Sequence, residues 1–70
     1  MKSVSTDTML NRLAGKVEDL GGQALAADHW GVSPQYVSMI LGGVKRPSRR
    51  ILGDLGLSVD REVKYRYFED

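Results

Sequence analysis

The sequence predicts a mainly helical domain of four short helices that ends in one C-terminal β-strand. Three observations support this prediction. Apolar residues recur at helical spacing through most of the chain, glycines and prolines interrupt that spacing at short intervals, and residues 59–68 change to a two-residue alternation. A chain of 70 residues can build one hydrophobic core. We therefore expect a single domain without a large catalytic cleft.

The first two helices are predicted over residues 6–20 and 23–30. Ser5 can cap the first helix, and Gly21-Gly22 stop it. The second is rich in alanine and leucine and ends at Gly31. Since it has about two turns, it must depend on tertiary packing. Apolar residues recur along the first helix at Leu10, Leu13, Val17 and Leu20.

The third helix is predicted over residues 34–41 and is followed by a short fourth helix. Ser33 can cap the third helix, while Pro34 suits its first position because the missing N–H is no loss there. Gly42-Gly43 end it, and the proline of the following loop prevents its continuation. Ser48 can cap the fourth helix, which ends at Gly56 and has Ile51, Leu52 and Leu55 on its inner face.

Residues 59–68 alternate between largely apolar and largely polar positions, which predicts one β-strand. No second segment shows a comparable alternation, and residues 1–4 are too short to be relied on. We therefore expect the strand to pair with the same strand of a second copy in an antiparallel homodimer ribbon. The alternative is a strand packed on its own helices. The expected dimer contacts are Val59, Val63, Tyr65 and Tyr67.

The charge of the chain is unevenly distributed although its net value is only +1. Residues 29–53 contain no acidic residue, and all four basic residues of this window lie in its second half. Such a concentrated basic segment favours a polyanionic partner, and the alternative is a solvated charged loop. The four residues are Lys45, Arg46, Arg49 and Arg50.

Several classes of protein are excluded by what the sequence lacks. The absence of cysteine excludes disulfides, thiolate chemistry and cysteine-ligated zinc, and His29 is the only histidine. No motif of a hydrolase, P-loop or zinc protease occurs, so we expect no enzyme, cofactor, metal or small-molecule ligand. No apolar run approaches the roughly 20 residues of a membrane span. A cytoplasmic location is expected.

The two central helices meet the positional requirements of a helix-turn-helix. With Gln23 as its first position, Ala27 is the fifth, where a larger side chain would separate the helices. Gly31 is the ninth, where the turn favours a left-handed backbone. Apolar positions that lock the second helix in place are occupied by Val32, Val37 and Ile40.

The chain resembles the lambda-repressor/Cro-like helix-turn-helix regulators of phages, prophages and bacteria. The resemblance covers roughly residues 8–58 and is carried by QALAADHWGVSPQYVSMILGG (residues 23–43), Pro47-Ser48 and Leu55-Gly56-Leu57. It implies that residues 1–58 form a DNA-binding domain whose third helix enters the major groove. It also implies a homodimer on a palindromic operator and a repressor function, with residues 59–70 as the dimerisation strand of the same domain.

Departures from the family pattern affect base reading and the end of the domain. Pro34 and Met39 stand where polar base-reading side chains are frequent, and Ala26 stands where the family prefers leucine. A strand replaces the last helix, which makes the ending Cro-like. The resemblance matches Gln23 to a phosphate contact, Gln35, Tyr36 and Met39 to the exposed positions of the recognition helix, and Lys45 and Arg46 to the backbone-contacting loop.

Helical rotation places Gln35 and Met39 opposite the apolar side of the third helix, with Tyr36 and Ser38 flanking them. The Gln35 amide can pair with adenine, whereas Met39 offers apolar contact, for example to a thymine methyl group. Arginines beside Ser48 can contact phosphate. The full expected DNA interface is Gln23, Ser33, Gln35, Tyr36, Ser38, Met39, Lys45, Arg46, Ser48, Arg49 and Arg50.

Two other functions remain open. The chain could be a protein-interaction module, such as an antirepressor or antitoxin, that reuses this scaffold. It could also bind RNA through its arginine cluster. We expect Trp30 to lie in the core, and we assign His29 no role.

Overall fold

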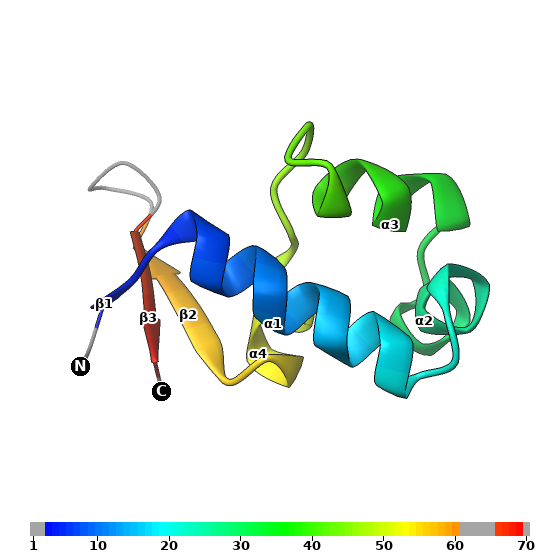
Figure 1. Ribbon diagram of the computed structural model, residues 1–70, viewed down its shortest axis with the longest axis horizontal. Helices are drawn as coiled ribbons and strands as arrows, with labels where there is room; N and C mark the ends of the chain where they lie inside the picture. The colour runs from blue at the N-terminus through cyan, green and yellow to red at the C-terminus, as the bar shows by residue number, and fades with distance from the viewer. Residues whose placement is uncertain (1–2, 61–65, 70) are drawn as a thin grey trace.

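Figure 1 shows the computed structural model of the chain, which describes residues 3–60 and 66–69. The described part is mainly helical, with four helices and a three-stranded sheet. None of its helices is long and apolar enough to cross a membrane. The elements in chain order are β1 (Ser3–Val4), α1 (Thr6–Asp19), α2 (Gln23–Trp30), α3 (Pro34–Leu41), α4 (Arg49–Asp54), β2 (Leu57–Asp60) and β3 (Arg66–Glu69).

The four helices begin and end at the predicted signals. The hydroxyl oxygens of Ser5, Ser33 and Ser48 each accept a hydrogen bond from a backbone N–H in the first turn of α1, α3 and α4. Gly21 and Gly22 follow α1 with φ of 101° and 115°, a region that disfavours residues with a Cβ atom. The predicted order and approximate bounds of the helices are therefore confirmed.

α2 and α3 pack against each other across a short turn that begins at Gly31. Gly31 has a left-handed φ of 69°, and the N–H of Val32 returns to the carbonyl of Ala27 at 2.9 Å. Val37 and Ile40, on the inner side of α3, are fully buried. This turn therefore fixes the direction in which α3 leaves α2.

The core joins all four helices to the sheet. Its members include Trp30, which is buried as expected. The sheet lies at one end of the molecule, beside the start of α1, while α2 lies at the other end (Figure 1). The buried residues that form this hydrophobic core are Met9, Leu13, Val17, Ala26, Ala27, Trp30, Val37, Ile40, Ile51, Leu52, Leu55, Leu57 and Tyr67.

The prediction that residues 59–68 form one strand without a partner in their own chain is wrong. β3 is the central strand, with β1 and β2 antiparallel on its two sides, so the segment 59–68 contributes to two strands that pair with each other. Val59 and Tyr67 lie opposite each other, and both pack toward the core. The alternation of apolar and polar residues therefore continues in phase from β2 to β3. β2 also runs across the expected boundary between residues 58 and 59.

The expected dimer contacts must be revised for the same reason. Tyr67 is only 4% exposed and belongs to the core of its own chain, and Val59 packs against that core. Neither side chain is therefore free to form the core of an intermolecular ribbon. Val63 and Tyr65 lie outside the described residues. Ser3–Val4, for which the sequence predicts no strand, completes the sheet beside β3.

Candidate nucleic-acid interface

The outward face of α3 is the first part of the candidate site. Pro34, Gln35 and Ser38 are exposed, and Met39 is half-buried. Met39 is not among the side chains that pack against the core. Helical geometry places these four residues opposite the buried side of the helix. α3 therefore presents one amide, one hydroxyl and two apolar groups to a partner.

The loop that follows α3 is held against the helix by several hydrogen bonds. The N–H groups of Val44 and Lys45 both point to the carbonyl of Met39, at 2.9 and 3.4 Å. The hydroxyl of Tyr36 donates to the carbonyl of Arg46 at 2.9 Å. In Figure 1 the loop rises beyond the end of α3 on the side away from α1. Its exposed side chains are thus carried on a fixed support.

Tyr36 is a site residue whose position gives it a structural task. Its side chain is half-buried and packs against the core, and its hydroxyl is engaged by the loop carbonyl. The sequence matched Tyr36 to an exposed position of the third helix. The structure adds that this tyrosine ties the loop to α3, a contact that no local sequence pattern indicates.

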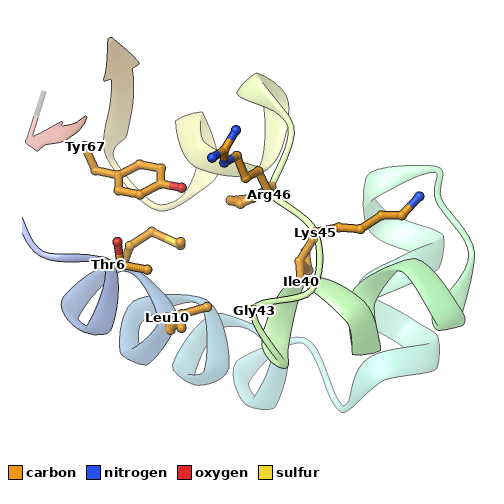
Figure 2. A pocket seen from close by; sticks show the side chains of 9 residues that line it. Thr6, Leu10, Ile40, Gly43, Lys45, Arg46 and Tyr67 are labelled. Carbon is orange, nitrogen blue, oxygen red and sulfur yellow. The ribbon is translucent and has the colours of Figure 1, made fainter. Parts of the chain in front are cut away.

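The four basic residues of the central window are all exposed, but they do not form one patch. Lys45 extends away from the body of the loop, and Arg46 points in another direction (Figure 2). Arg50 lies near the α2–α3 turn, since its Nη1 is 3.9 Å from the position that a Cβ atom on Gly31 would take. Arg49 instead lines a groove beside β2. Cations therefore lie near both ends of α3, with Arg49 apart from them.

A pocket of about 240 Å³ lies beneath the basic loop. It is bounded by the start of α1, the end of α3 and β3, and the side chain of Tyr67 projects into it (Figure 2). Buried Met9 and Ile40 form part of its apolar wall. Gly43, Lys45, Arg46 and Pro47 of the loop line the opposite wall, and Pro47 is buried, so packing supports the loop together with its hydrogen bonds to α3.

The remaining expected contacts lie at helix starts. Gln23 is exposed in the first turn of α2, where no side chain caps the helix. The hydroxyls of Ser33 and Ser48 accept backbone N–H groups at 3.1 and 3.4 Å. The two serines therefore fix the starts of α3 and α4, and Ser33 is exposed while Ser48 is half-buried.

A polar cluster that the sequence did not indicate joins α2 to α4. The buried indole of Trp30 donates its Nε1–H to Oδ2 of Asp54 at 2.7 Å, and Nε2 of His29 lies 3.3 Å from the same oxygen. The hydrogen bond from Trp30 is the main reason that the pKa of Asp54 falls below its ordinary value of 3.8, while partial burial opposes the shift. The cluster fixes the end of α4 relative to α2.

A second long-range contact ties α1 to the end of the chain. The Arg12 guanidinium forms an ion pair with Glu69 on β3 and donates to the carbonyl of Leu55 at 3.4 Å. Arg12 therefore connects α1, the end of α4 and the central strand. Among the described residues, no group of acidic, histidine or cysteine side chains could hold a metal ion.

Comparisons with known proteins add no assignment to this geometry. No protein-family model matches the chain, and no significant match is found among curated proteins or solved structures.

Proposed function

We propose that this chain is a sequence-specific DNA-binding transcriptional regulator of the lambda-repressor/Cro-like kind. In this proposal α2, the Gly31 turn and α3 form a helix-turn-helix, and α3 enters the major groove of an operator. The observation that carries the proposal is the exposed face of α3 beside a fixed basic loop. A single helix fits the width of the major groove, which is about 12 Å.

The positions of the basic residues support the same arrangement. Lys45 follows the C-terminal end of α3, and Arg50 lies near the turn that precedes its N-terminal end. A helix in the major groove has a phosphate backbone on each side, so cations at both ends of α3 are suitably placed for phosphate contacts. Gln35, on the exposed face between them, is the proposed reader of an adenine.

Selection of bound sequences from a random duplex library tests this function. The purified chain should enrich a near-palindrome whose half-sites are one helical turn apart, about 34 to 36 Å. A failure to enrich any motif, or a motif without dyad symmetry, would contradict the proposal. A protein-interaction module would show no salt-dependent DNA affinity, and an RNA-binding protein would prefer RNA over the duplex in direct competition.

Two substitutions separate base contacts from phosphate contacts. Gln35→Ala should relax the preference at one base pair of each half-site by roughly 1 to 3 kcal/mol. Lys45→Ala should weaken binding to all sequences and reduce the magnitude of the salt slope by about 1. Lys16→Ala, on α1, is the matched control and should leave that slope unchanged. An equal loss on all sequences for Gln35→Ala would remove it from base reading.

We further propose that the chain binds its operator as a homodimer joined at the sheet. Among the described strands, β2 pairs on one side only, and half-buried Phe68 lies on the face of the sheet opposite Tyr67. The molecule is 31 Å long, with the sheet at one end and α3 beyond the middle (Figure 1). Two copies joined at the sheet would therefore hold their α3 helices apart on the two sides of the interface, as binding to two separate half-sites requires.

Sedimentation equilibrium of Phe68→Asp tests this dimer. A charge placed at the joined sheets should give a monomer with weaker operator binding, because an interface cannot easily bury an unpaired carboxylate. Leu25→Asp is the control, since Leu25 is 55% exposed on α2, near the opposite end of the molecule. A Phe68→Asp variant that stays dimeric would place the interface elsewhere.

A further inference from the structure

We infer that the half-sites bound by α3 are rich in A·T pairs and that thymine methyl groups, rather than guanine edges, carry much of their recognition. This inference rests on the proposed DNA-binding function and names the class of sequence that the site selects. It follows from the chemical groups that α3 and its loop present to solvent.

The first observation is that α3 contains no charged residue in any of its eight positions. Arginine and lysine are the usual readers of the guanine O6 and N7 atoms, and aspartate or glutamate accepts from the cytosine N4 amino group. None of these side chains stands on the exposed face of α3. The hydrogen-bonding side chains on that face are Gln35 and Ser38. A glutamine amide pairs in a bidentate manner with the adenine N6 and N7 atoms.

The second observation is that three apolar residues on α3 and its loop, Pro34, Met39 and Val44, lie outside the core near Gln35 in sequence; we name these three residues the apolar strip. Pro34 is exposed, Met39 lies outside the core, and Val44 is 75% exposed. The N–H of Val44 is bonded to the carbonyl of Met39 at 2.9 Å, which holds the tip of the loop at the end of the helix. The backbone at the tip of the loop is therefore fixed beside the last turn of α3.

The thymine C5 methyl group is the apolar group that a base pair presents in the major groove. Gln35 would read an adenine, and the apolar strip would cover thymine methyl groups. Both contacts favour the same kind of sequence, which is one rich in A·T pairs. Exposed Lys45 directly follows Val44, so a positive charge lies beside the strip. This charge favours a polyanion over an apolar protein surface as the partner of the strip.

Uracil substitution in the selected operator tests this inference. Replacement of one thymine by uracil removes its methyl group but keeps the base pair and its hydrogen-bonding edge. At the positions covered by the apolar strip, each replacement should weaken binding about three- to fourfold, the value of one buried methyl-sized group. Thymines outside the half-sites are the control and should tolerate uracil without loss.

Protein variants then assign the effect to individual side chains. Met39→Ser should abolish the uracil effect at one position of the half-site, while Gln35→Ala should retain the uracil effect there. Val44→Ser is a second variant and should abolish the uracil effect at a different position. Because the Val44 side chain is exposed, this substitution should not impair folding. Circular dichroism of each variant checks the helical content. Unchanged uracil sensitivity at every position in both serine variants would overturn the inference.

The result separates this inference from the function on which it rests. Failure to bind any duplex specifically would overturn the DNA-binding proposal itself. Specific binding to G·C-rich half-sites, or specific binding that is insensitive to uracil at every position, would leave that proposal intact and overturn only the reading of thymine methyl groups.

Discussion

Removal of the Asp54 carboxylate should destabilise the fold by leaving the indole N–H of Trp30 without its partner. Trp30 is 2% exposed, and its Nε1 lies 2.7 Å from Oδ2 of Asp54, a short distance for an N–H donor to a carboxylate. A buried donor that loses its acceptor costs about 1 to 3 kcal/mol. We expect Asp54→Ala to fall in the lower half of that range because the Asp54 side chain is 37% exposed and water can reach the site.

Thermal unfolding followed by circular dichroism measures this effect. A loss of about 1 to 2 kcal/mol lowers Tm by roughly 4 to 16 °C in a domain of this size. Asp54→Asn keeps an oxygen that can accept from the indole, so it should cost less than Asp54→Ala. His29→Ala should cost about 0 to 1 kcal/mol, as expected of an exposed contact.

A double-mutant cycle identifies the hydrogen bond as the cause. Trp30→Phe removes the donor, so Asp54→Ala should cost clearly less in that background than in the wild type. Additive losses, with equal effects of Asp54→Ala and Asp54→Asn, would refute the reasoning. They would show that the carboxylate stabilises the chain by a route other than its contact with the indole.

Three further predictions concern the loop after α3, the turn at Gly31 and the loss of stability at acid pH. Tyr36→Phe should cost about 0.5 to 1.5 kcal/mol in urea unfolding and should weaken operator binding, because the hydroxyl no longer holds the Arg46 carbonyl; unchanged binding would show that the loop does not need this tie. Gly31→Ala should lower stability by about 1 to 2 kcal/mol because the φ of residue 31 is 69°. The nearest atom, on Arg50, is 3.9 Å from the new methyl group and leaves room for it, so the loss would come from backbone strain. An unchanged Tm would contradict this strain. Since the folded-state pKa of Asp54 is depressed, its contribution is present above pH 3.8 and is lost as the pH falls through the folded-state value; Asp54→Asn should flatten this part of the stability profile, and an identical acid transition would refute the assignment.

The helices could be predicted because their boundaries depend on neighbouring residues. Ser33 and Pro34 start α3 through local hydrogen bonding and a restricted φ, and Gly31 ends α2 because it accepts a left-handed backbone. The exposed face of α3 follows from the 3.6-residue period once Val37 and Ile40 are recognised as buried. These features do not depend on where distant segments lie.

The sheet could not be predicted in the same way. Alternation identifies the extended residues and their apolar face, but it does not show where a chain reverses when both strands pack on one core. Ser3 and Val4 gain their strand conformation by pairing with Phe68 and Tyr67, almost a full chain length away. Two residues carry too little periodic information to show this pairing.

The candidate site could be predicted only where it depends on local helical geometry. Gln35 and Met39 follow from helical geometry, but the divergence of Arg49 from Arg50 depends on how α4 is oriented, which is a tertiary property. The tie from Tyr36 to the loop and the contact between Trp30 and Asp54 also join separate elements. Such pairs have no fixed spacing in sequence, so single-residue patterns do not show them.

The position of β3 at the centre of the sheet has a consequence for synthesis of the chain. Of the described strands, β3 is the last to be made, yet it is the only described partner of both β1 and β2. During translation, α1 to α4 can emerge and begin to collapse while these two strands still lack their ladder. The pairing of Ser3 with Phe68 must therefore wait until residues 66–69 have left the ribosome. A nascent chain that is arrested before residue 66 should remain sensitive to proteases around Ser3–Val4.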